Sequence, residues 1–142
     1  MQVIVGCLIE DNGKYLMVQE GSKSRYGLWN YPGGHLEEKE TIIEGAIRET
    51  FEETGYHVEV TGVLPVEQLI REDNHFIVIK FVGKIVSYDE HHELDGILQT
   101  KWMSSEEIFN LEEKEFRGYD ANRRFLTNYL DNNIYPLSIF NK

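Results

Sequence analysis

The stretch that most constrains the fold of this chain is residues 33–56, with the sequence GGHLEEKETIIEGAIRETFEETGY. Thr41 followed three residues later by Glu44 is the signature of a capping box, in which each side chain bonds to the other residue's backbone at a helix start. Gly55 stands where a helix commonly ends in the left-handed conformation. These two signals predict a helix from Ile42 to Thr54.

The predicted helix has a side that can be buried and an acidic side. The first side collects, at about 100° per residue, Ile43, Ala46, Ile47, Thr50, Phe51 and Thr54. Glu49, Glu52 and Glu53 lie roughly opposite, and each neighbouring pair of carboxylates repels by very roughly 1–3 kcal/mol. A divalent cation would reverse that repulsion. Gly45 is on the same side, where a missing side chain leaves room for a close approach. The alternative, a plain solvated face, does not explain the glycine turn upstream.

A known family carries this spacing of glycines and charges. Gly34, Glu40 and the run RETFEETGY at residues 48–56 resemble the Nudix box, the signature of hydrolases that act on a nucleoside diphosphate linked to another group. Every charged and glycine position of that pattern is filled. Thr50 and Tyr56 stand where the pattern has aliphatic residues, and core packing can absorb both changes.

Three further runs resemble a bacterial phosphatase branch of the same family, the NudJ-like enzymes, which act on nucleoside di- and triphosphates and on thiamine-type pyrophosphates. These runs are WNYPGGHLE at residues 29–37, KWMSSEEI at residues 101–108 and YPL at residues 135–137. The second resemblance spans most of the chain. We therefore expect a single Nudix hydrolase domain over residues 1–142, with its box at residues 34–56.

The resemblance implies a metal-dependent active site. The metal ligands that it implies are Glu49, Glu52, Glu53 and the backbone carbonyl of Gly33. Hard oxygen ligands of this kind suit Mg²⁺, with Mn²⁺ as a substitute. Catalytic roles are implied for Glu49, Glu52 and Arg48, which would hold a box carboxylate, either Glu52 or Glu40, by a charge-assisted pair. The alternative for Arg48 is a routine surface pair between residues four apart.

A general base comes either from the box or from the polar loop after the long apolar strand. That loop carries Glu90, His91, His92 and Glu93. Members of the family often supply a base from this position along the sequence. Adjacent histidines are more often plain loop residues, so Glu93 is the preferred candidate in this loop.

The loop at residues 21–31 mixes cations with aromatic rings immediately before the glycine turn. Such a mixture suits phosphate contact and base stacking. We expect Arg25, Trp29 and Tyr31 to bind the substrate. In the alternative interpretation, Trp29 and Tyr31 only fill the core beneath the loop.

Length and charge exclude several classes of protein. A chain of 142 residues is expected to form one domain that buries about two thirds of its unfolded surface. A net charge of −11, with 25 acidic against 14 basic residues, disfavours extended nucleic acid, whose phosphates bind surfaces rich in Lys and Arg. A small phosphorylated substrate such as a nucleotide is compatible with the negative net charge, because divalent cations bridge an acidic protein and an acidic substrate.

Cysteine content and hydropathy bear on location. Cys7 is the only cysteine, which leaves no intramolecular disulfide and no thiol cluster for zinc and fits a reducing, intracellular setting. The first residues carry no basic region ahead of apolar ones, and no apolar run approaches the ~18 residues of a membrane helix. We therefore expect a soluble, cytoplasmic protein without a membrane partner.

Apolar runs and turn signals predict strands around two helices. The expected strands are residues 3–10 and 15–19 in a hairpin, two short pieces within 58–70, a long central strand at 75–88, and residues 97–103. A short helix follows Ser104, and a last helix at residues 120–130 should turn Ala121, Phe125 and Tyr129 inward, with Leu126 and Leu130 as further candidates. This order predicts an α/β sandwich with a mixed sheet between the two longer helices, and the resemblance implies the same Nudix-type fold.

The C-terminal segment is apolar for a chain end. Its apolar residues are Ile134, Tyr135, Leu137, Ile139 and Phe140. Burying three of them is worth ~5 kcal/mol before the entropy of ordering is subtracted, so we expect the segment to be ordered. Docking beside the last helix of the same chain is favoured, and packing across a homodimer is the alternative, so that both a monomer and a homodimer are compatible.

Two alternatives to an enzyme stay open at this point. One is a catalytically idle nucleotide-sensing module on the same fold, which usually has a damaged box, whereas this box keeps Arg48, Glu49, Glu52 and Glu53. The other is an interaction protein whose acidic helix is only a solvated face, and the apolar tail is its one supporting feature.

Overall fold

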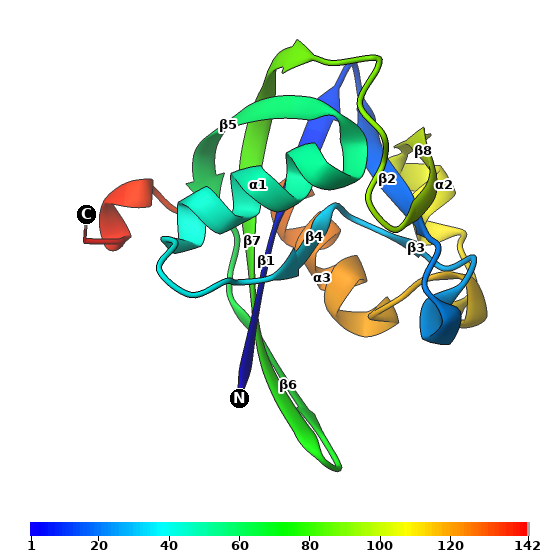
Figure 1. Cartoon of the computed structure of the whole chain (residues 1–142). Coiled ribbons are helices and arrows are strands. Elements are labelled where there is room, and N and C mark those ends of the chain that lie inside the picture. The colour runs from blue at the N-terminus through cyan, green and yellow to red at the C-terminus, as the bar shows by residue number, and fades with distance from the viewer. Residues whose placement is uncertain (142) are drawn as a thin grey trace.

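The fold is a mixed sheet with a helix on each side. The computed structural model describes residues 1–141 (Figure 1). Its strands are β1 (Gln2–Asp11), β2 (Lys14–Glu20), β3 (Trp29–Asn30), β4 (Gly33–His35), β5 (Tyr56–Val63), β6 (Glu67–Arg71), β7 (Asn74–Tyr88) and β8 (Ile97–Ser104). Its helices are α1 (Ile42–Thr54), α2 (Ser105–Phe109) and α3 (Tyr119–Leu130), with short 3-10 turns at Lys23–Arg25, Glu113–Glu115 and Leu137–Ile139.

The strand order is β3-β2-β1-β7-β5, with β4 on β1, β6 on β7 and β8 on β2. β1 and β7 run parallel and all other pairs are antiparallel. β1 pairs with β2 only next to the hairpin turn, where Asn12 and Gly13 both have positive φ. Beyond the turn the two strands diverge, and β4 pairs with β1 instead. This divergence brings the glycine turn of residues 33–34 onto the centre of the sheet.

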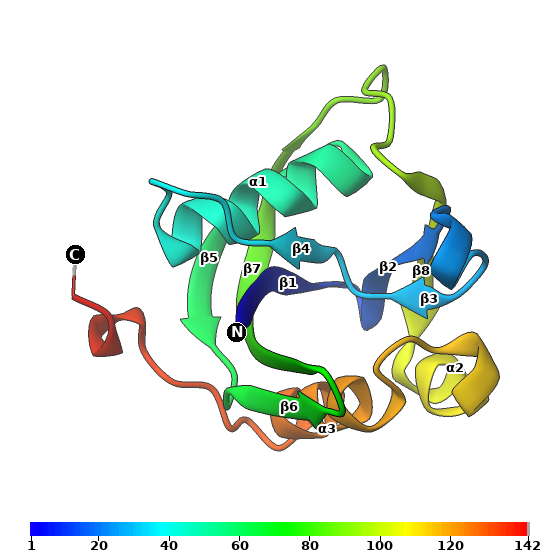
Figure 2. The same cartoon turned by 60° about the horizontal axis from the view of Figure 1, so that its bottom comes forward.

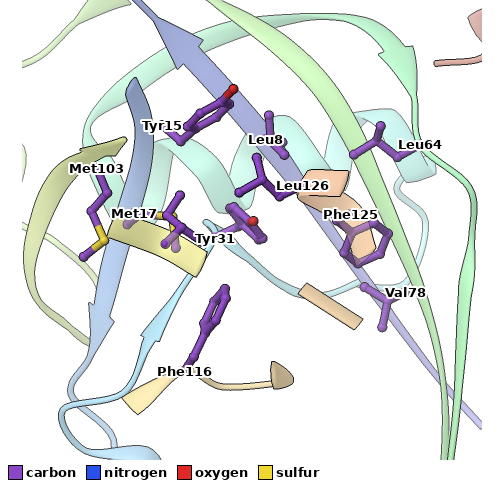
Figure 3. Packing of buried hydrophobic residues seen from close by; sticks show 11 residues of the cluster. Leu8, Tyr15, Met17, Tyr31, Leu64, Val78, Met103, Phe116, Phe125 and Leu126 are labelled. Carbon is purple, nitrogen blue, oxygen red and sulfur yellow. The ribbon is translucent and has the colours of Figure 1, made fainter. Parts of the chain in front are cut away.

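Each face of the sheet buries its own core. Successive side chains of a strand point to opposite faces, so β1 sends Val5, Cys7 and Ile9 to the α1 side and Leu8 to the α3 side. Ala46 of α1 belongs to the first cluster, whereas Phe125 and Leu126 of α3 belong to the second, which Figure 3 shows. Figure 2 shows the two helices on opposite sides of the strands. The predicted α/β sandwich is confirmed.

Local signals placed most elements correctly. Helix α1 has the predicted bounds, with the Thr41–Glu44 capping box formed and Gly55 in the left-handed conformation at φ 79°. The broken stretch after it forms β5 and β6, as expected. The short strands β3 and β4 were not predicted. The expectation that Leu130 turns inward is wrong, because its side chain is 50% exposed.

The C-terminal segment docks on its own chain. Tyr135 and Val63 exchange backbone N–H···O bonds of 2.8 and 2.9 Å, which ties the segment to the edge strand β5. Ile134 packs on the core cluster of the α3 side, whereas Leu137 and Phe140 pack on that of the α1 side. The segment is therefore ordered, but it lies along β5 and turns away from α3 (Figure 2). In residues 1–141, no helix combines the length and apolar character that a membrane crossing needs.

Candidate active site

One arginine, Arg48, holds two acidic residues of α1 and one from the loop before it. The guanidinium of Arg48 forms a fork on Glu40, donating from Nε and Nη2 at 2.9 and 2.8 Å. Its Nη1 donates to one carboxylate oxygen each of Glu49 and Glu52 at 3.0 Å, and its Nη2 also donates to the carbonyl of His35 at 3.1 Å. Hydrogen bonds from Arg48 lower the pKa of Glu40, and the Glu40 carboxylate in turn raises the pKa of Arg48. Both carboxylates that the sequence offered as partners of Arg48 therefore bind it, and Glu49 is a third.

Gly45 serves a different purpose from the one expected. A Cβ at this position would lie 2.8 Å from Leu36, 2.9 Å from a carboxylate oxygen of Glu40 and 3.1 Å from Val5. The space left by the missing side chain is therefore filled by the chain itself. This close packing holds the loop before α1 against the helix and brings Glu40 within reach of Arg48.

Glu49 and Glu53 turn toward the glycine turn of β4. The amide of Gly33 donates to Oε1 of Glu53 at 3.0 Å. A Cβ at Gly34 would lie 2.5 Å from the carboxylate carbon of Glu49, so only glycine leaves room for it. The alternative of a plain solvated face therefore does not describe these two residues. Their carboxylates lie between the helix and the backbone of β4.

Burial makes both carboxyl groups hard to ionise. It raises the pKa of Glu53 to about 8, against the opposing hydrogen bond from Gly33. Burial also raises the pKa of Glu49, although Arg48 opposes this effect. Two neighbouring carboxyl groups with raised pKa values, next to a backbone turn, are a site where bound positive charge is favourable.

The residues fit a divalent metal in part. In the described residues 1–141, no three His, Cys, Asp or Glu side chains converge in a ready-made cluster. Glu49 and Glu53 converge beside Gly33, whereas Glu52 is bound to Arg48 and its side chain is 36% exposed. Mg²⁺ usually takes only one or two carboxylates and keeps several waters. A hard oxygen donor set of two carboxylates and a backbone carbonyl meets that requirement.

A cleft of about 1030 Å³ opens at these two carboxylates. Its lining includes Glu20, Glu49 and Glu53, the backbone of Gly33 and Gly34, and five cations, which are Arg25, Arg71, Lys80, Arg117 and Arg124. Ligand pockets typically measure about 300–1,000 Å³, so a nucleotide can be accommodated. Carboxylates and cations facing one cavity suit a ligand that is bound through metal and phosphate together.

A hydrogen-bonded network forms one wall of the cleft. Arg117 donates to Glu20 at 2.9 Å, and Asn30 donates to the same carboxylate at 3.3 Å. The amide nitrogen of Asn122 donates to Asn30 and to the Arg117 carbonyl, both at 2.8 Å. These residues come from β2, β3 and α3 and the segment before α3, so the network fixes the relative positions of separate elements.

The structure separates the three residues expected to bind substrate. Arg25 lines the cleft, and within the described chain its guanidinium has no hydrogen-bond or ion-pair partner, although its backbone bonds to Ser22 and Leu28. Tyr31 is fully buried, donates its hydroxyl to the Asn122 carbonyl at 3.1 Å and lies among Met17, Leu126 and Phe116 (Figure 3). Trp29 packs against the same core and does not line the cleft. For Trp29 the alternative interpretation, filling the core, agrees with the structure, whereas Tyr31 fills the core and also borders the cleft.

The polar loop after β7 is tied to the end of α1, but Glu93 is not brought to the cleft. The amide of Asp95 and the imidazole Nε2 of His92 each lie 2.9 Å from the carbonyl oxygen of Glu52. The His92 ring also packs on Phe51, at 4.4 Å between centroids. Glu93 is exposed and absent from the cleft lining. Its expected role as a base therefore has no support in the geometry.

Lys80, Arg117 and Glu20 were not singled out from the sequence. Arg117 and Glu20 lie 97 residues apart in the chain, and the local sequence around neither residue predicts their ion pair. For Lys80 there was a signal, because it is the one charge inside the apolar run HFIVIKFV at residues 75–82. A lysine in the middle of a buried strand is rare unless it has a partner.

Known proteins share both the sequence pattern and the fold. The NUDIX domain model matches residues 1–129. The chain is 32% identical over 133 residues to Phosphatase NudJ of Escherichia coli K12, covering 87% of this chain and 86% of that protein. A NUDIX hydrolase from Nitrosomonas europaea superposes with a TM-score of 0.92 at 30% identity, covering 99% of this chain and 96% of the other. The MutT protein from Methanosarcina mazei Go1 gives 0.75 at 26% identity, with coverage of 93% and 94%. Together with the intact box on α1, these likenesses show that the chain belongs to the Nudix family and is a Nudix hydrolase.

Proposed function

We propose that this protein hydrolyses a phosphoanhydride bond in a nucleoside di- or triphosphate, or in a related small molecule linked to a nucleoside diphosphate, with Mg²⁺ as its cofactor. The observation that carries the proposal is the pair of partly buried carboxyl groups of Glu49 and Glu53 at a cleft that five cations also line. Residues 1–142 would act as one Nudix domain. The similar E. coli protein is named a phosphatase, which supports phosphate-ester or anhydride chemistry.

Glu49, Glu53 and the carbonyl of Gly33 would hold the metal, and Glu52 would join them after release from Arg48 or act through bound water. When bound, Mg²⁺ polarises phosphoryl oxygens and lowers the pKa of a coordinated water, and Mn²⁺ is expected to substitute. Arg48 orients Glu49 and Glu52 while it also binds the carbonyl of His35 at the end of β4.

The base that accepts a proton from the attacking water is best sought in the box. Glu49 and Glu52 share the Arg48 guanidinium. If one of these carboxylates binds the metal, the other is free to accept the proton. Glu93 stays a prediction, and it would have to move with its loop to reach the cleft. Arg25, with no partner in the described chain, is the cation most available for a substrate phosphate.

The test is the release of phosphate or pyrophosphate from a panel of nucleoside di- and triphosphates and nucleotide sugars, with and without Mg²⁺. Chromatography of the products identifies the bond that breaks. We expect turnover that disappears with a chelator and in Glu53→Gln, which also excludes a contaminating phosphatase. Tight nucleotide binding with no turnover would favour a sensing module instead. A cytoplasmic location and the oligomeric state stay predictions.

A further inference from the structure

Lys80 is a buried cation that the proposed chemistry does not yet use. It lies at the centre of the inner strand β7, and only 3% of it is exposed. Within the described residues its ammonium makes no hydrogen bond or ion pair, and its nearest aromatic neighbours are the rings of Tyr31 and Phe125, at 5.3 and 5.7 Å from Nζ. No buried side-chain nitrogen or oxygen in residues 1–141 is sealed from solvent and unpaired, so the ammonium keeps access to the cleft that it lines.

The ammonium lies beneath the glycine turn that binds Glu53. Gly6 of β1 is the register partner of Lys80, and a Cβ at Gly6 would lie 3.1 Å from Nζ. The same Cβ would lie 2.9 Å from Cα of Gly33 and 2.2 Å from the carbonyl oxygen of Pro32. The missing side chain of Gly6 therefore lets the lysine and the turn share one small space. Because the amide of Gly33 binds Glu53, Lys80 and Glu53 are both neighbours of the glycine turn and line the same cleft, without forming an ion pair.

The surroundings leave the charge of Lys80 only partly compensated. Burial lowers the pKa of the ammonium to about 8, with Cys7, Glu53 and Glu20 opposing this effect and Arg117 adding to it. Glu20 is already bound by Arg117 and Asn30. A metal on Glu53 would neutralise the other nearby carboxylate. Aromatic rings replace only part of the hydration that a buried ammonium loses, so an anion is the partner that the site lacks.

We propose that the ammonium of Lys80 binds a non-bridging phosphoryl oxygen of the substrate's diphosphate at the floor of the cleft. This inference rests on the proposed function, and it makes Lys80 a direct substrate contact. An ammonium is a compact charge with three donors, which suits phosphate oxygens in a narrow space. A residue that only filled this position could be apolar, because its neighbours Tyr31 and Phe125 are aromatic.

The competing role is structural, in which Lys80 only offsets the charge of Glu53 and Glu20. The two roles separate in Lys80→Met, an unbranched side chain that can pack against the same rings. Lys84→Met, at an exposed position on the same strand, is the matched control. The first measurement is calorimetric binding of methylenediphosphonate, a diphosphate analogue that cannot be hydrolysed, in the presence of Mg²⁺. The second is Mn²⁺ binding to the protein without the analogue, followed by electron paramagnetic resonance.

We expect Lys80→Met to bind methylenediphosphonate about 10- to 100-fold more weakly than wild type, the range for losing a hydrogen bond to a charged group. Its Mn²⁺ affinity should not fall, because removing a neighbouring positive charge does not weaken the binding of a cation, and Lys84→Met should match wild type in both. Wild-type affinity of Lys80→Met for the analogue overturns the proposal. A loss of Mn²⁺ affinity that accounts for the whole loss of analogue binding also overturns it, because Lys80 would then act through Glu53.

Two further measurements keep the result decisive. Lys80→Gln is the second uncharged variant if methionine prevents folding. In the wild-type protein, the ¹³Cε signal of Lys80 in ¹³C-lysine spectra should shift when methylenediphosphonate binds, and an unmoved signal contradicts a contact. If wild type turns over no nucleotide yet loses analogue binding through Lys80→Met, the proposed function fails while the Lys80 contact stands. If wild type turns over nucleotide and Lys80→Met has the same kcat and KM, the proposed function stands and the Lys80 contact fails.

Discussion

The two kinds of charge in the cleft are built in different ways. The two carboxylates proposed to hold the metal, those of Glu49 and Glu53, come from one helix and are positioned by the turn beside it. Its cations come from separate parts of the chain, which are the loop before β3 (Arg25), β6 (Arg71), β7 (Lys80), the segment before α3 (Arg117) and α3 itself (Arg124). Glu40, Glu49 and Glu52 form a compact unit around Arg48, and the adjacent glycine turn binds Glu53, whereas the cations meet only because the whole fold assembles.

Because of this difference, substitutions of the carboxylates and of the cations should change different kinetic constants. A change at the carboxylates alters the groups that hold the metal at the bond to be broken, so it should appear mainly in kcat. A change at a cation that contacts a phosphate held equally in the bound and transition states should appear mainly in KM. The predictions below test this division, beginning with the largest expected effect.

Glu53→Gln should lower kcat about 1,000-fold or more, because losing one ligand of a catalytic metal costs several kcal/mol of transition-state stabilisation. KM should change little. The melting temperature should not fall, since the substitution removes a buried carboxyl group and keeps an acceptor for the Gly33 amide. Steady-state kinetics with Mg²⁺ and a thermal melt check both parts, with Glu59→Gln, at an exposed position of β5, as the control. Full turnover by Glu53→Gln would show that Glu53 holds no essential metal.

Arg48→Lys should lower kcat by about 10- to 100-fold, the usual cost of removing a group that orients metal ligands. A lysine keeps the charge but cannot bind Glu40 through a fork and reach Glu49 and Glu52 at the same time. Mn²⁺ affinity should fall with kcat. If kcat and Mn²⁺ affinity are both unchanged, Arg48 contributes only an ordinary surface pair, and the carboxylates do not form a unit around it.

Arg25→Ala should raise KM about tenfold while lowering kcat less, because this cation lines the cleft without a partner in the described chain. Lys23→Ala, two residues away and outside the cleft lining, is the matched control. Kinetics with several nucleotides give the comparison. An unchanged KM for every substrate would remove Arg25 from the binding site.

Deleting residues 134–142 should leave both kinetic constants nearly unchanged and lower the melting temperature by about 5 °C. The segment contributes two backbone hydrogen bonds to Val63 and the burial of Ile134, Leu137 and Phe140, partly offset by the entropy of ordering it. Light scattering should show the same oligomeric state as the full chain. A change from dimer to monomer would favour an interface role, and an unchanged melting temperature would show that the docking adds no stability.

The carboxylate unit could be predicted from the sequence because its signals are local. Thr41, Glu44 and Gly55 define the helix, and the spacing within the box places Arg48 on the same side as the glutamates. The local pattern did not reveal how far the carboxylates of Glu49 and Glu53 are buried. Glu49 and Glu53 lie against β4, a three-residue strand that forms only because β1 and β2 diverge.

Most of the cations that line the cleft could not be predicted from the sequence. Arg117 reaches the cleft through a bond to Glu20, and such a contact depends on the packing of α3 against the sheet. The aromatic residues of the loop before β4 could not be assigned from the sequence, since an aromatic ring fits a core as well as a ligand site. Trp29 packs on the core away from the cleft, whereas Tyr31 is in the core and borders the cleft. Glu93 shows the limit for loops, whose direction is decided by contacts such as that of His92 with Glu52.

The most direct test of this account is a crystal structure with Mn²⁺ and methylenediphosphonate, in which anomalous scattering locates the metal. The account predicts Mn²⁺ about 2.1 Å from carboxylate oxygens of Glu49 and Glu53 and from the carbonyl oxygen of Gly33, the distance typical of small hard cations. It also predicts a phosphonate oxygen within hydrogen-bond distance of Nζ of Lys80. A metal bound away from α1, or a diphosphonate that leaves the floor of the cleft empty, would contradict it.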